Sequence, residues 1–181
     1  MKEIITDRLI LNGFTADDVN DVFEYAKTDL VGPNAGWAPH KDIDETRAVV
    51  DDYIKTNVFA IRLRDTGRVI GSLGLHETSI CSGIRCLSGI EMGYVLSPDH
   101  WGSGYMTEAA RAAAKYAFDE LGYQVIWCGY FEDNDRSRRV QEKLGMRECY
   151  VKFTEVKVLD DTFVEHINFA TKEMLENAMN K

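Results

Sequence analysis

Apolar and polar residues alternate in short runs along much of the chain, which is the pattern of strands with one buried face. We expect strands at residues 8–13, 58–64, 68–76, 89–96, 124–131, 148–158 and 163–170. Apolar residues at helical spacing instead predict four helices. The first begins near Thr15, the second covers 43–55, the third includes Ala109–Ala117 and the fourth covers 134–144. This mixed order, with no internal repeat or linker, favours one α+β domain with a mixed sheet over residues 1–181.

Cap and turn residues refine the expected boundaries. Asp42 or Asp44 lies near the cap of the second helix, and Gly145 closes the fourth helix. The tripeptide Asp65-Thr66-Gly67 predicts a hairpin between two strands. The residues expected on buried helix faces are Val19, Val22, Phe23 and Ala26 in the first helix and Ala109, Ala112, Ala113, Tyr116 and Ala117 in the third.

The charge balance narrows the classes of partner. The chain has 30 acidic and 21 basic residues in a length of 181, with a net charge of -9. This charge repels phosphate backbones and disfavours nucleic acid, so a cationic or amine-bearing partner suits it better. The sequence contains no apolar run of the roughly 20 residues that a membrane span needs, and the start MKEIITDRLIL lacks the features of a signal peptide. We therefore expect a cytoplasmic protein with no membrane partner.

The cysteines give no sign of a metal site. Cys81, Cys86, Cys128 and Cys149 form no C-x-x-C pair and have no histidines at zinc spacing around them. We interpret them as reduced thiols, although Cys81 and Cys86 are close enough in sequence to meet in one loop.

Two glycines stand between a predicted strand and an alanine-rich helix, in the stretch SPDHWGSGYMTEA. The first N–H groups of a helix lack partners and carry partial positive charge, so glycines at this place let a phosphate approach the backbone. A dinucleotide-binding G-x-G-x-x-G motif would need a third glycine, and a P-loop would need Gly-Lys-Ser/Thr; the sequence has neither. A turn that binds no ligand remains the alternative on spacing alone.

Three stretches in this order resemble the GNAT N-acetyltransferases, and within them the RimJ/RimL-like branch that acetylates protein N-termini and small amines. They are TDRLIL at Thr6–Leu11, EMGYVLSPDHWGSGYMTEA at Glu91–Ala109 and NDRSRRVQEKLGM at Asn134–Met146. The resemblance implies a GNAT fold, in which helices flank a mostly antiparallel sheet that splays between two adjacent strands. It also implies acetyl-coenzyme A (acetyl-CoA) as co-substrate and no metal.

The resemblance assigns the cofactor-binding residues. The implied pyrophosphate cradle consists of the backbone amides of Gly102, Ser103, Gly104, Tyr105 and Met106, with the Thr107 hydroxyl as a further donor. Asp99 departs from the family pattern, which prefers Gln or Arg at this position, and its side chain must turn outward. The remaining members are Tyr94, Val95 and Leu96 on the strand, Asn134 at the pantetheine arm and Ser137 at the thiol. The basic cluster Arg136, Arg138 and Arg139 suits the phosphates or the adenine end by its charge, with Arg139 as the candidate, and a solvated helix face is the equal alternative.

Acetyl transfer requires a neutral amine, and therefore a base or a water chain that removes a proton. Strand alternation places Glu91 on the face opposite Ile90 and Met92, so Glu91 is the first candidate for the base. An ion-paired or solvent-facing Glu91 is the structural alternative. His76 is the competing base because its unperturbed pKa lies near 6.5, but its place at a strand end favours simple exposure.

Other groups would complete the catalytic and acceptor sites. The backbone N–H groups of Tyr94 and Val95 would receive the charge that develops on the carbonyl oxygen. Ser137 would bind the departing thiolate or protonate it, although asparagine and serine at this spacing could also simply cap a helix. Trp37 and His40 in the loop VGPNAGWAPHKD would join Glu91 around the acceptor, although Trp37 could equally fill the core.

Together these features predict direct transfer of an acetyl group from acetyl-CoA to a primary amine in a ternary complex. The amine would belong to a protein N-terminus or to a small molecule, and the enzyme would be a monomer or a homodimer. Cys128 more readily fills core space than serves as a covalent nucleophile. A catalytically silent coenzyme A-binding module and a plain scaffold with an empty turn are the alternatives.

Overall fold

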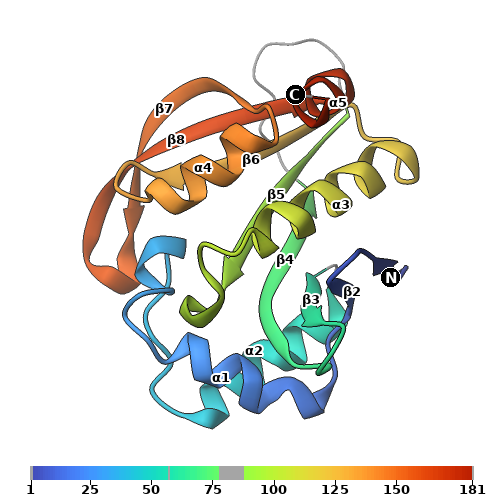
Figure 1. The fold of residues 1–181 in the computed structure, drawn as a ribbon. Helices are drawn as coiled ribbons and strands as arrows, with labels where there is room; N and C mark the ends of the chain where they lie inside the picture. The colour runs from blue at the N-terminus through green and yellow to red at the C-terminus, as the bar shows by residue number, and fades with distance from the viewer. Residues whose placement is uncertain (1, 57, 78–87, 181) are drawn as a thin grey trace. The chain divides into compact units, whose positions relative to one another are not determined.

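The structure is a computed structural model that describes residues 2–56, 58–77 and 88–180 (Figure 1). Its strands are β1 (Ile4–Ile5), β2 (Leu9–Gly13), β3 (Val58–Leu63), β4 (Val69–Glu77), β5 (Gly89–Leu96), β6 (Val125–Phe131), β7 (Arg147–Val156) and β8 (Asp161–Thr171). Its α-helices are α1 (Val19–Ala26), α2 (Ile43–Lys55), α3 (Tyr105–Asp119), α4 (Asp135–Lys143) and α5 (Lys172–Met179). The elements follow the predicted order, with β1 added before it and α5 after it.

Hydrogen bonds join the strands in the order β1-β2-β3-β4-β5-β6-β8-β7. Of the strand pairings that the structure describes, that of β5 with β6 is parallel and the others are antiparallel. The parallel pairing runs from Gly89 opposite Val125 to Glu91 opposite Trp127 and ends there, before the end of β5. A mostly antiparallel sheet whose pairing stops partway along β5 confirms the predicted fold class.

Two compact units make up the chain, and β4, β5 and α3 run through both of them. The first unit comprises Met1–Gly74 and Tyr94–Ala109, and the second comprises Leu75–Gly93 and Ala110–Lys181. Each unit has its own buried residues, so the two are described in turn.

The core of the first unit forms where α1 and α2 pack with residues of β3 and β4. Val19, Val22 and Ala26 of α1 are buried as predicted, whereas Phe23 is half-buried. They form one apolar cluster with Val50 of α2, which is fully buried. The helical periodicity of this region therefore identified most of the face that α1 buries, which also includes Tyr25.

Local signals at the ends of elements act as expected in the first unit. The Asp42 side chain caps α2 by accepting hydrogen bonds from the N–H groups of Asp44 and Glu45, so Asp42 rather than Asp44 is the cap. Gly67 has a φ of +72°, which glycine adopts without strain, and it lies in the turn between β3 and β4. The predicted hairpin is therefore confirmed.

A buried ion pair ties α1 to the sheet of the first unit. Both guanidinium Nη atoms of Arg62 on β3 donate to the Asp18 carboxylate over 2.6 Å, and Arg62 Nε donates to Asn12 Oδ1 over 2.7 Å. The same carboxylate accepts from the backbone N–H of Thr15 over 2.7 Å. Burial raises the pKa of Asp18, but the hydrogen bonds from Arg62 and Thr15 outweigh it and hold this pKa below its ordinary value.

The second unit is organised around β6, β8 and β7. Val125 and Trp127 on β6 and Ile167 on β8 form a buried cluster, and the Phe169 ring lies 5.7 Å from the Trp127 ring between centroids. Helix α4 ends at Lys143, and Gly145 follows its cap residue with a φ of +75°, which suits glycine. A β-carbon at Gly145 would lie 2.7 Å from a backbone oxygen of α5, so glycine also allows this close approach.

The buried face of α3 differs in part from the prediction. Ala109, Ala113 and Ala117 are buried as expected, whereas Ala112 and Tyr116 are half-buried. The residues buried in addition are Met106, Thr107, Ala110, Ala114 and Phe118. Alanines on nearly every side of this helix remove the contrast in polarity from which a face is predicted, so the sequence located the stripe less well than in α1.

Two elements were not predicted. Strand β1 is only two residues long, which is too short for an alternation to be visible. Helix α5 begins directly after β8, where the Thr171 hydroxyl accepts a hydrogen bond from the N–H of Met174. Thr171 thus ends β8 and caps α5 without an intervening loop. The sequence therefore has no turn residues there that would mark the change from strand to helix.

Candidate cofactor-binding and active site

The glycine-rich turn belongs to the first unit and connects β5 to α3. Gly102 and Gly104 have φ values of +76° and +80°, a region that side chains with a β-carbon rarely adopt. A β-carbon at Gly102 would meet no atom within 4 Å, so this glycine is required by its backbone conformation and not by crowding. The chain can turn here only because both positions are glycine.

The turn presents backbone N–H groups at the start of α3. The N–H of Glu108 donates to the Gly104 carbonyl over 3.0 Å and closes the first helical turn. The N–H groups of Tyr105, Met106 and Thr107 come before that bond, where a helix has no internal acceptor for them. These amides and the partial positive charge of the helix terminus are suited to a phosphate.

Contacts within the first unit hold the turn against the strands. The indole N–H of Trp101 donates to the Leu96 carbonyl over 2.9 Å, and the N–H of Ser97 donates to Ile70 of β4 over 2.7 Å. The Asp99 side chain is exposed, in agreement with the expectation that it turns outward. Leu96 is buried, whereas Tyr94 and Val95 are half-buried on the last part of β5.

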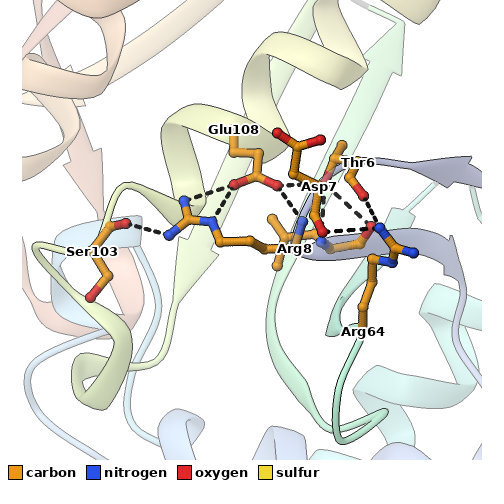
Figure 2. A network of polar contacts seen from close by, with 7 residues as sticks. Thr6, Asp7, Arg8, Arg64, Ser103 and Glu108 are labelled. Atoms are coloured by element: carbon orange, nitrogen blue, oxygen red, sulfur yellow. Dashed lines mark hydrogen bonds and ion pairs between the residues drawn. The ribbon is translucent and has the colours of Figure 1, made fainter.

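Arg8 and Glu108 contact the turn and were missed by the sequence analysis (Figure 2). Arg8 donates through Nε to Glu108 Oε2 over 2.7 Å and through Nη1 to the Ser103 carbonyl over 2.9 Å. The Thr6 hydroxyl donates to Glu108 Oε1 over 2.6 Å, and the N–H of Arg8 donates to the same oxygen over 2.9 Å. Burial raises the pKa of Glu108, but the hydrogen bonds from Thr6 and Arg8 hold it below its ordinary value.

The candidate bases Glu91 and His76 both lie in the second unit. Glu91 is half-buried at the last described pair of the parallel pairing, opposite Trp127, while Ile90 and Met92 on the other face are buried. The alternation that the sequence predicted for this strand is therefore present. His76 lies near the end of β4 and is exposed, as its position indicated.

The N-terminus of α4 in the second unit carries Asn134 and Ser137. Asn134 caps this helix, and its Oδ1 accepts a hydrogen bond from the N–H of Ser137 over 3.1 Å. The Ser137 hydroxyl oxygen accepts from Nε2 of Gln141 over 3.3 Å. The capping interpretation of Asn134 is thus correct, and it does not exclude a contact with a ligand at the same helix terminus.

Gln141 is a fully buried polar residue that the sequence analysis did not select. Its Nε2 also donates to the Gly129 carbonyl of β6 over 3.1 Å, and its Oε1 accepts from Nδ2 of Asn168 on β8 over 2.9 Å. The amide is held from both ends, so the position of its Nε2 beside Ser137 is fixed. The signal available from sequence was a polar residue on the apolar side of a short helix.

The positive charge of the basic cluster on α4 is partly neutralised by acidic residues of the same helix. Arg138 pairs with Asp135 over 2.8 Å and with Glu142 over 2.9 Å. The hydrogen bond from Arg138 lowers the pKa of Asp135. Arg136 and Arg139 are exposed on the same helix. Of the three arginines, Arg138 is thus the least suited to a phosphate, and Arg139 stays the candidate.

The loop that holds Trp37 and His40 is ordered by contacts within the first unit. The two rings lie 5.1 Å apart between centroids, and His40 Nδ1 is 2.8 Å from the Thr46 hydroxyl oxygen. Trp37 is partly buried against the core cluster of this unit. Burial lowers the pKa of His40, although Glu45 acts in the opposite direction.

The cysteines that the structure describes are Cys128, which is buried, and Cys149, which is exposed. Cys81 and Cys86 lie outside the described residues. Among the described residues, no group of three or more His, Cys, Asp or Glu side chains is arranged to hold a metal ion. None of the described helices is long and apolar enough to cross a membrane.

Known proteins resemble this chain over most of its length. Residues 8–147 match the family model described as an acetyltransferase (GNAT) domain. The uncharacterized N-acetyltransferase YoaA of Bacillus subtilis (strain 168) is 28% identical over 149 residues, which cover 79% of this chain and 81% of that protein.

Solved structures agree with this match. A GNAT-family acetyltransferase from Bacillus anthracis has a TM-score of 0.84 at 25% identity, over 95% of this chain and 99% of the other. A Vibrio cholerae spermidine N-acetyltransferase in complex with CoA and spermine has a TM-score of 0.76 over 95% of this chain and 100% of the other. Its identity is 16%, so this second likeness shows the fold alone.

Proposed function

Because the chain belongs to the GNAT acetyltransferase family and is an N-acetyltransferase, we propose that it transfers acetyl directly from acetyl-CoA to a primary amine in a ternary complex. The observation that carries this proposal is the turn with two glycines at positive φ that opens directly into the N-terminus of α3. Family membership provides the acetyl donor. The order of the reaction, the acceptor and the role of each residue are the proposed parts.

The cofactor-binding residues proposed from sequence have the chemistry that the coenzyme requires. The amides of Gly102–Met106, with the Thr107 hydroxyl, would hold the pyrophosphate, because successive N–H groups and a helix terminus favour an anion. Asn134 would hold the pantetheine arm from the cap of α4. Arg139, with its fixed positive charge, would face the phosphates or the adenine end.

Glu91 is the proposed base that keeps the attacking amine neutral. A half-buried carboxylate can accept a proton from an ammonium group and pass it to solvent. The N–H groups of Tyr94 and Val95 would stabilise the negative charge that develops on the carbonyl oxygen. Backbone donors are fixed before the reaction, so they need not rearrange during it. His76 is the alternative base, and its exposure at the end of β4 ranks it second.

Ser137 is the proposed partner of the sulfur atom of the coenzyme. Its oxygen accepts the hydrogen bond from Gln141 Nε2, and a hydroxyl that accepts in this way donates through its own hydrogen. A serine hydroxyl is a weak acid, so we assign it the binding of the thiol or thiolate and leave full proton transfer to water.

The proposed acceptor is a primary amine on a protein N-terminus or a small molecule. The motifs at Thr6–Leu11 and Asn134–Met146 favour the RimJ/RimL-like branch, and the net charge of -9 favours a cationic acceptor. Trp37 and His40 would form an aromatic wall beside it. A polyamine is one small-molecule amine to test, since the Vibrio cholerae spermidine N-acetyltransferase that shares this fold is in complex with spermine.

Initial rates of thiol release, with acetyl-CoA and the amine both varied, test the ternary complex. We expect double-reciprocal lines that intersect, because both substrates must be bound before the acetyl group moves. Parallel lines would indicate a covalent acetyl-enzyme and would contradict the proposal. The panel of amines should contain an N-terminal peptide, a polyamine, an aminoglycoside and a free amino acid, and the best acceptor is used for the full analysis.

A further inference from the structure

The guanidinium group of Arg8 is held by Glu108 and Ser103 (Figure 2), and it also lies over the Tyr105 ring. Its Nε and Nη2 each lie 2.7 Å from Oε2 of Glu108, and its Nη1 donates to the Ser103 carbonyl over 2.9 Å. Its plane also lies near the Tyr105 ring, with 4.3 Å from the guanidinium carbon to the ring centroid. Arg8 therefore connects the N-terminal segment to the residues on both sides of Gly104.

Peptide geometry shows in which direction the N–H group of Gly104 points. In a trans peptide the C=O and the following N–H point in opposite directions, and the described residues contain no cis peptide bond. The Ser103 carbonyl points to Arg8, so the N–H of Gly104 points away from Arg8. The Gly104 carbonyl in turn accepts from Glu108 N, so the N–H of Tyr105 points out of the helix N-terminus.

We propose that Arg8 is a positioning residue that keeps the Gly104 N–H directed at the pyrophosphate of the coenzyme. Glu108 and Thr6 act with it, because the carboxylate that holds Arg8 is itself held by the Thr6 hydroxyl and the Arg8 N–H. This inference rests on the proposed role of the turn in binding the coenzyme. Ordering a flexible glycine when the ligand binds costs conformational entropy and weakens binding. A glycine that is already fixed avoids this cost.

The exposure of this ion pair supports a local role over a role in overall stability. The Arg8 side chain is 45% exposed and that of Glu108 is 19% exposed. Exposed pairs contribute little to the stability of a fold because water and salt screen them. The Arg8 donors are directed at Glu108 and Ser103. We therefore expect Arg8 to affect phosphate binding through the Ser103–Gly104 peptide that it orients.

Binding of coenzyme A and of pantetheine, measured by calorimetry without an acceptor, tests this inference. Pantetheine carries the thiol arm but has no pyrophosphate. We expect Arg8→Ala to raise the Kd for coenzyme A about tenfold or more, as for loss of a hydrogen bond to a charged group. The Kd for pantetheine should stay within about twofold of wild type, since that ligand does not use the turn.

Glu108→Gln separates positioning from direct contact. If Arg8 acts through the turn, this variant weakens coenzyme A binding as Arg8→Ala does, because Arg8 loses its anchor. Unchanged or tighter binding by Glu108→Gln would overturn the inference, because a released Arg8 could then bind the phosphate itself.

Arg64→Ala is the matched control, because Arg64 donates to the carbonyls of Thr6 and Asp7 but not to the turn. We expect it to bind coenzyme A like wild type. An equal loss in Arg64→Ala, or equal losses for coenzyme A and pantetheine in Arg8→Ala, would also overturn the inference. Because no acceptor is present, wild-type protein that binds coenzyme A but acetylates no amine would refute the proposed reaction and leave this inference intact.

Discussion

Replacing the proposed base Glu91 with glutamine lowers kcat for acetyl transfer by about 10²–10⁴-fold, which is the usual contribution of a positioned acid or base. Glutamine keeps the size and shape of the side chain at this half-buried position on β5 but cannot accept a proton. The Kd for coenzyme A should stay within about twofold of wild type, because the carboxylate is not assigned to that ligand. Initial rates at saturating acetyl-CoA and direct binding measurements separate the two effects.

A pH profile and a matched variant make this test decisive. The rate of Glu91→Gln should rise more steeply with pH than that of wild type, because the amine then depends on solvent to lose its proton. His76→Gln is the control and should retain the wild-type rate, since His76 is exposed at the end of β4. The opposite result, with activity lost in His76→Gln and kept in Glu91→Gln, would transfer the role of base to His76.

Asp18→Asn should lower the free energy of unfolding by about 3–5 kcal/mol, which is typical when one partner of a buried ion pair is removed. The side chains of Arg62 and Asp18 are 14% and 6% exposed, so the remaining guanidinium would be left without its carboxylate in a mostly buried place. Asp17→Asn is the matched control, because Asp17 is exposed and adjacent, and it should change stability by less than about 0.5 kcal/mol. Urea denaturation measures both.

The same ion pair predicts a dependence on pH. Because the pKa of Asp18 in the folded protein is below its ordinary value, its contribution is complete above the unfolded pKa of about 3.9. The contribution is lost as the pH falls from there through the folded pKa. Wild-type stability should therefore decrease over this window more than that of Asp18→Asn.

Replacing both partners checks that the pair itself causes the effect. In Asp18→Asn/Arg62→Met the buried guanidinium is removed as well, so the loss should be smaller than the sum of the two single variants. A stability of Asp18→Asn equal to that of wild type, or strictly additive losses in the double variant, would contradict the role assigned to this pair.

Local patterns were enough to predict most of the elements and the turn. The bounds Ile43–Lys55 of α2 and Gly89–Leu96 of β5 agree with the prediction, because a cap residue or a clear alternation marks each of them. The G-x-G spacing also located the two residues that adopt positive φ in this turn. These features depend on a few consecutive residues, and such residues can be read without knowing the fold.

The contacts that support the site depend on residues far apart in sequence. Arg8 and Glu108 are separated by 100 positions, and each resembles an ordinary surface charge until the fold brings them together. Gln141 lies on the apolar side of a short helix, but the sequence does not show that its amide is held by Gly129 and Asn168, which are distant in sequence. Tertiary packing alone determines these partners, so local sequence patterns cannot show which residues support the candidate site.

The most direct test of the central claim follows the acetyl group itself. Wild-type protein is incubated with acetyl-CoA that carries an isotopic label in the acetyl group and with the panel of amines, and both small molecules and protein are analysed by mass spectrometry. We expect the label to appear on the nitrogen of an amine acceptor and none to remain on the protein. Tight binding of acetyl-CoA with no label on any amine would contradict the proposed acetyl transfer and favour a coenzyme A-binding module without turnover.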